Sequence, residues 1–175
     1  MGRTNFGSSL ILSVVSRRMF VLATMMTLLQ QVSGTPYVIG GDSTAGTDCS
    51  GVVSWVSNMA ADRPVFGDRF NTGNEESALL ARGFKYGTAP GALVIGWNGG
   101  HTAATLPDGT PVSSGEGGGV RIGGAGAYQP RFTHHMYLPV ELEGPEDALP
   151  PFPVDAAAPE PPPPPAPDAA PAEGV

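Results

Sequence analysis

The single cysteine of this 175-residue chain lies where a thiol could act as a nucleophile. Cys49 belongs to the run Asp48-Cys49-Ser50-Gly51, one residue before a helix that the spacing of apolar residues predicts over 50–61. The positive end of a helix and its free N–H groups favour a thiolate, so this position predicts a lowered thiol pKa and a sulfur that points outward. A lone cysteine is also often a buried structural residue, and that alternative stays open.

A thiol nucleophile needs a base, and the chain holds three histidines. His101 follows two glycines and begins a predicted strand, so its ring can project from a strand end. His134 and His135 are neighbours on another predicted strand and therefore point to opposite faces. No third ligand at a suitable spacing accompanies this pair, so we predict no metal site there. His101 is the better base.

Helical patterns come first along the chain and extended patterns follow. After the helix over 50–61, a second helix is predicted over 74–81, with Glu75 and Glu76 in its first turn, where their charge suits the positive helix end. Beyond Pro90 the apolar runs are short and separated by turn formers such as Asp108-Gly109. They predict strands over 92–97, 101–106, 110–113, 120–122 and 134–140. This order predicts an α+β domain in which helices pack on an antiparallel sheet of about five strands.

The two ends of the chain differ from this central part. We expect an N-terminal extension over 1–19, the domain over 20–140 and a disordered tail over 141–175, which is acidic and rich in proline and alanine. Two arginines precede the apolar run after residue 18 and look like a twin-arginine export signal. The run over 20–32 is equally consistent with an amphipathic first helix of the domain. Neither apolar run near the N-terminus approaches the roughly 20 residues of a membrane-spanning helix.

Charge and cysteine content exclude several classes of protein. The net charge is -7, and no cluster of Lys and Arg is present, which argues against nucleic acid as a partner. One cysteine cannot form an intrachain disulfide or a four-cysteine zinc site. The glycine-rich stretch over 115–126 lacks the Gly-Lys-Ser/Thr of a phosphate-binding loop.

Two pairs of segments carry a recognisable pattern. The first joins 35–41 (TPYVIGG) to 48–53 (DCSGVV), and the second joins 91–95 (GALVI) to 100–103 (GHTA). Together they resemble the NlpC/P60 cysteine peptidases of the papain-like fold. More narrowly, the chain is similar to peptidase domains at the ends of actinobacteriophage tail tape-measure proteins. That similarity runs from about residue 20 to 140 and includes 96–98 (GWN), 105–110 (TLPDGT) and 132–139 (FTHHMYLP).

The resemblance implies roles for individual residues. Cys49 would attack an amide carbonyl, and His101 would pair with the thiolate and then protonate the departing amine. The backbone N–H of Cys49 would help to stabilise the oxyanion. Tyr37, Asp48 and Ser50 match family positions that shape the substrate subsite. The alternatives for these three are a core residue, a helix cap and a first-turn residue.

The third catalytic position departs from the family pattern. The family usually places a His, Asn or Gln on the strand after the histidine, where this chain has Ser113. Glu116 follows in a loop and could orient His101 if the loop folded inward. The glycines around Glu116 instead favour a solvated surface carboxylate. We take Ser113 as the third residue of the predicted site.

The implied activity is that of a thiol protease, a hydrolase that cuts amide bonds in the peptide stems of bacterial peptidoglycan, the cell-wall polymer. It implies no cofactor and no metal. The partner would be the cell wall, with association with the cell envelope or a phage tail, and the location would be extracytoplasmic, secreted or in the virion. The alternative is a catalytically weak or inactive wall-binding or phage-tail structural module of the same fold.

Overall fold

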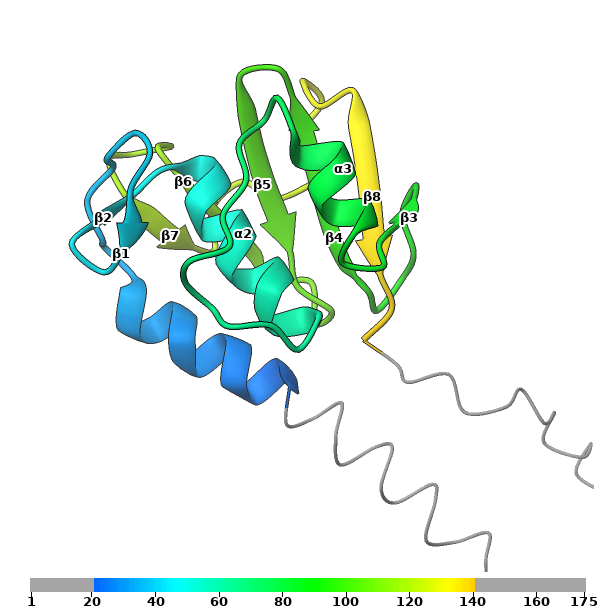
Figure 1. Ribbon diagram of the computed structural model, residues 1–175, viewed down its shortest axis with the longest axis horizontal. Helices are drawn as coiled ribbons and strands as arrows, with labels where there is room; N and C mark the ends of the chain where they lie inside the picture. Colours follow the sequence, from blue (N-terminus) through cyan, green and yellow to red (C-terminus); the bar gives the residue numbers. More distant parts are fainter. Residues whose placement is uncertain (1–20, 141–175) are drawn as a thin grey trace, which may run out of the picture. The chain divides into compact units, whose positions relative to one another are not determined.

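The computed structural model describes residues 21–140 (Figure 1), all of which belong to one compact unit, Met1–Gly144. Residues 1–20 and 141–175 lie outside the described residues. The expected N-terminal extension or export signal over 1–19 and the expected disordered tail over 141–175 therefore stay predictions.

A six-stranded antiparallel sheet forms the centre of the domain, in the order β3-β8-β4-β5-β6-β7. The sequence predicts a sheet of about five strands and so misses one. That strand is an exposed two-residue segment that pairs through its backbone with β8 and carries no apolar pattern of its own. The strands are β3 (Lys85–Tyr86), β4 (Leu93–Asn98), β5 (His101–Thr105), β6 (Pro111–Ser114), β7 (Val120–Ile122) and β8 (His134–Leu138).

Helices α2 (Cys49–Ala60) and α3 (Glu75–Leu80) both lie in front of this sheet in Figure 1. Helix α2 packs on β5 and β6. Val52, Trp55 and Val56 on this helix are fully buried and join apolar side chains of β4 and β5 in a single core. The α+β arrangement of a few helices on an antiparallel sheet is therefore confirmed. Both ends of each helix lie within one residue of the predicted bounds.

Residues 21–32 form a further helix that packs on the same core. Met25, Leu29 and Val32 recur at helical spacing, and each is buried. This packing agrees with an amphipathic helix that belongs to the domain. No helix among the described residues is both long and apolar enough to cross a membrane.

A small hairpin of β1 (Asp42–Ser43) and β2 (Gly46–Thr47) precedes α2 and was not expected from the sequence. The segment over 37–41 belongs to no strand, although Tyr37 forms an isolated bridge with Thr47. The hairpin leads directly into Asp48 and so determines where α2 begins.

Candidate active site

Cys49 is the first residue of α2, with Asp48 as the helix cap. The Oδ1 atom of Asp48 accepts a hydrogen bond of 2.8 Å from the backbone N–H of Gly51. The expectation of an outward sulfur is wrong, because Cys49 is only 6% exposed. The cap places the thiol at the helix start, but neighbouring segments cover it.

Hydrogen-bonding groups of three described residues lie at the thiol. The Tyr37 side chain is hydrogen-bonded to it, and the backbone N–H groups of Thr102 and Ser50 donate to the sulfur. Burial raises the pKa of the Cys49 thiol, and these two N–H groups only partly offset that effect. The predicted lowering of the thiol pKa is therefore wrong, because the cost of desolvating a thiolate exceeds what the helix start supplies.

His101 is the first residue of β5, and a tight turn precedes it. The Oδ1 atom of Asn98 accepts hydrogen bonds from the N–H groups of Gly100 and His101, at 2.9 and 3.0 Å. The imidazole ring is partly buried and stacks on Phe132. Thr102, whose N–H contacts the Cys49 sulfur, is the next residue along β5. The fold thus brings the thiol to the start of the histidine's strand, although no hydrogen bond joins sulfur and imidazole in the described part of the chain.

Glu116 is the acidic side chain that contacts the His101 ring. Its Oε1 atom lies 3.0 Å from Nε2 of His101, and Arg131 forms an ion pair with the same oxygen. Ser113 donates a hydrogen bond of 3.2 Å to the other carboxylate oxygen. The expectations of a solvated Glu116 and of Ser113 as the direct partner of His101 are therefore both wrong.

The glycine-rich loop over 115–119 explains this difference. Gly115 and Gly117 adopt positive φ values of 97° and 109°, which side-chain-bearing residues rarely adopt. These turns fold the loop back toward β6. The Glu116 side chain, which is longer than that of Ser113, therefore reaches the His101 ring, and Ser113 donates a hydrogen bond to its carboxylate. Glycine content indicates a loop, but it does not say which way the loop folds.

Two charges act on His101 in opposite directions. Burial lowers the pKa of the His101 imidazole, Arg131 lowers it further, and Glu116 raises it. The net pKa lies below the usual value of 6.5, so the ring is mostly neutral at pH 7. A neutral imidazole can accept a proton, and Nδ1 is the nitrogen for that role because Nε2 is engaged by Glu116.

Asp48 is the centre of a polar cluster beside the thiol. Its carboxylate accepts hydrogen bonds from the N–H of Gly40 at 2.7 Å, from Ser50 Oγ at 2.9 Å and from Arg69 at 2.7 Å. The backbone N–H groups of Gly40 and Gly51 lead the interactions that hold the Asp48 pKa below its usual range despite its burial. Asp48 thus caps the helix, which was the alternative reading, and its role in a substrate subsite stays a prediction. Arg69 was not predicted, since it lies in a loop outside any motif.

A cleft of about 420 Å³ opens beside the histidine. Tyr37 is 41% exposed, and it both lines this cleft and contacts the buried thiol. Cys49 itself does not line the cleft. The lining residues are Tyr37, His101, Gly115, Glu116, Gly118 and Arg131.

Glu75 is a buried acid near the thiol that the sequence did not single out. Its position in the first turn of α3, next to Glu76, is typical of a solvated helix start, yet its exposure is zero. Burial raises the pKa of its carboxyl to about 8. Only the docking of α3 against β5 distinguishes Glu75 from its exposed neighbour.

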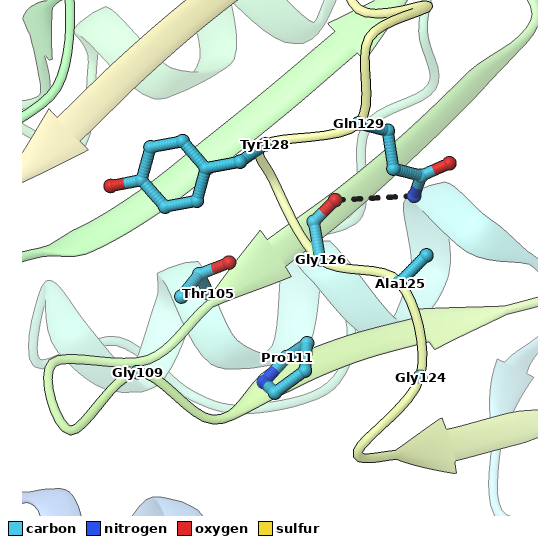
Figure 2. A pocket seen from close by; sticks show the side chains of 8 residues that line it. All are labelled: Thr105, Gly109, Pro111, Gly124, Ala125, Gly126, Tyr128 and Gln129. Carbon is cyan, nitrogen blue, oxygen red and sulfur yellow. Dashed lines mark hydrogen bonds between the residues drawn. The ribbon is translucent and has the colours of Figure 1, made fainter.

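A second hollow lies at the far end of β5 from His101 (Figure 2). Thr105 and Tyr128 line it, and Gln129 donates a hydrogen bond to the carbonyl of Gly126 across one side. No titratable pair meets there. Within residues 21–140, no three His, Cys, Asp or Glu side chains gather as a metal-binding group.

A scan against models of known protein families finds no match to this chain, and a search of curated proteins finds no similar sequence.

Proposed function

We propose that this chain is a cysteine peptidase of the NlpC/P60 papain-like type that cleaves amide bonds in the peptide stems of bacterial peptidoglycan. One observation carries the chemistry: the Cys49 sulfur accepts a hydrogen bond from Thr102, next to a histidine whose ring is bound by a carboxylate. The order of nucleophile, base and orienting acid is the one that thiol catalysis requires. The substrate class is supported only by the resemblance in sequence.

The proposed reaction has two steps. In acylation, the Cys49 sulfur bonds to the amide carbonyl carbon while Nδ1 of His101 accepts the thiol proton. The C–N bond then breaks, and the imidazolium returns that proton to the departing amine. In deacylation, water attacks the thioester with His101 as base, which releases a carboxylic acid and restores the thiol. The N–H of Cys49 would donate to the oxyanion in both steps.

Glu116 would act as a positioning residue, since it touches the imidazole rather than the substrate. It takes the role first assigned to Ser113, which supports the carboxylate. Tyr37 is the strongest candidate for substrate contact, because it lines the cleft. Asp48 and Ser50 would shape the substrate subsite indirectly. The Asp48 carboxylate already forms an ion pair with Arg69.

This function would place the protein outside the cytoplasm, secreted or at the cell envelope, or in a phage virion as a tail component related to tape-measure peptidase domains. The fitting partner is the cell wall, and the reaction uses no cofactor.

Digestion of purified peptidoglycan tests the proposal. The wild type should release stem-peptide fragments with new termini that mass spectrometry identifies, and Cys49→Ala and His101→Gln should reduce release to background. His134→Gln is the matched control, because His134 is exposed and lies on another strand. Undiminished release by a folded Cys49→Ala protein would end the assignment.

The alternative of a weak or inactive wall-binding module has one observation in its favour. Burial raises the Cys49 pKa, which leaves little thiolate at neutral pH. This alternative predicts that the protein sediments with peptidoglycan and that Cys49 reacts with a thiol probe, while no peptide is released. Release that depends on Cys49 would exclude it.

A further inference from the structure

Glu75 is bound to β5 through one short contact. Its Oε1 atom lies 2.6 Å from the hydroxyl oxygen of Thr102, and its Oε2 atom is buried without a hydrogen-bond partner. No charged group pairs with this carboxyl in the described residues. An ionised carboxylate in such a place would be both desolvated and half unsatisfied, which strongly disfavours the charged form.

The hydrogen bonds of Thr102 point to the same protonation state. Its hydroxyl oxygen lies 2.6 Å from Glu75 Oε1 and 3.3 Å from the carbonyl oxygen of Gly96, but the hydroxyl carries a single hydrogen. Both contacts are satisfied at once if a protonated Glu75 donates to Thr102 and Thr102 donates to Gly96. The geometry therefore fits a neutral Glu75, and the raised pKa of about 8 agrees with it.

Thr102 joins this buried acid to the nucleophile. Its side chain contacts Glu75 on α3, while its backbone N–H donates to the Cys49 sulfur at the start of α2. A negative charge on Glu75 would oppose a thiolate on Cys49, as Asp48 already does from the helix cap. Tyr37 is the other titratable side chain that contacts the thiol in the described residues, and His101 precedes Thr102 on β5.

We propose that protonated Glu75 is a positioning residue that fastens Thr102 to α3 and keeps its N–H on the Cys49 sulfur, and that ionisation of Glu75 suppresses the thiolate at alkaline pH. The consequence for catalysis rests on the proposed peptidase function. The effect on the thiol does not, because it concerns only groups within the chain.

The rate of alkylation by iodoacetamide between pH 6 and 10 tests this proposal. Cys49 is the only cysteine, so the rate of mass increase reports on it alone. Wild type and Glu75→Gln should react equally at pH 7, where both side chains are neutral. At pH 9 the Gln variant should react faster by about threefold, as expected for a thiol pKa lower by about half a unit.

Glu76→Gln is the matched control, since Glu76 is exposed, adjacent and bonded to Tyr86. It should keep the wild-type profile. Superimposable profiles of wild type and Glu75→Gln would overturn the proposal, and so would an equal acceleration by Glu76→Gln. If the predicted alkylation profile appears while peptidoglycan stays intact, the peptidase function fails and the role of Glu75 stands.

A measurement on the wild type does not depend on the folding of any variant. In protein labelled with ¹³C-glutamate, the Glu75 carboxyl carbon should titrate with a midpoint near the pKa of about 8. A midpoint below about 6, close to the ordinary range of glutamate, would overturn the proposal.

Discussion

The Nε2 atom of His101 lies 3.0 Å from Oε1 of Glu116, and Arg131 pairs with the same carboxylate oxygen. The imidazole therefore experiences an anion in contact with it and a cation one contact further away. Each charge moves the His101 pKa, in opposite directions. The balance between them determines how much neutral imidazole is present at a given pH.

Replacing each charge separately should shift the His101 pKa in opposite directions. Glu116→Gln removes the anion and should lower the pKa, whereas Arg131→Gln removes the cation and should raise it, each by about half to one unit. NMR titration of the ring in a Cys49→Ala background measures both shifts. Shifts of the same sign in the two variants would contradict the shared-carboxylate arrangement.

Asp48→Asn should destabilise the domain. The change removes the charge that accepts from Gly40, Ser50 and Arg69 and leaves the Arg69 cation partly buried without a counter-ion, at a cost of about 1–3 kcal/mol in the free energy of unfolding. Urea denaturation at pH 7 measures the loss. Asp108→Asn, an exposed turn residue, should change stability by less than about 0.5 kcal/mol.

The destabilisation caused by Asp48→Asn should also depend on pH. The folded-state pKa of Asp48 is lowered below 3.8, so its contribution to stability is present above that value and is lost as the pH falls through the folded pKa. The difference between wild type and Asp48→Asn should therefore shrink below pH 3.8. A difference that stays constant down to the acid transition would show that the carboxylate charge is not the cause.

Gly96→Ala should be strongly destabilising and should disturb the histidine. A methyl group at Gly96 would collide with the Ala127 carbonyl and with the ring of Phe132, on which His101 stacks. Overpacking of this kind costs about 1–3 kcal/mol. At Gly99, in the turn before His101, a methyl group meets nothing within 4 Å. Gly99→Ala should thus keep both the unfolding midpoint and the NMR signals of His101, and equal losses in the two variants would contradict the packing described.

Glu75→Gln should change how stability depends on pH. Folding raises the Glu75 pKa from 4.5 to about 8, so between these values the folded wild type binds a proton that the unfolded chain has lost. The stabilising effect of this proton is fully present below pH 4.5 and is lost as the pH rises through about 8. Gln cannot titrate, so the stability of the wild type should fall relative to the variant by about 1.4 kcal/mol per pH unit in this window. Denaturation at several pH values measures the slope, and parallel curves would refute it.

Local patterns predicted much of the framework. The helix after Cys49, the helix with Glu75 in its first turn and the five longer strands were each expected, because apolar periodicity and turn residues depend only on near neighbours in the sequence. The two-residue strand β3 carries no such pattern and was missed. It forms only because β8 offers its backbone at that edge.

The sequence by itself determined that one thiol would stand at the start of a helix and that His101 would begin a strand. Tertiary structure alone decided the state of these groups. Burial raises the pKa of the Cys49 thiol although the N–H of Thr102 opposes that change, and the folded-back loop puts Glu116 on the imidazole. Docking of α3 makes Glu75 a buried acid while Glu76 stays in water. Desolvation and charge proximity depend on segments distant in sequence, so no local pattern reports them.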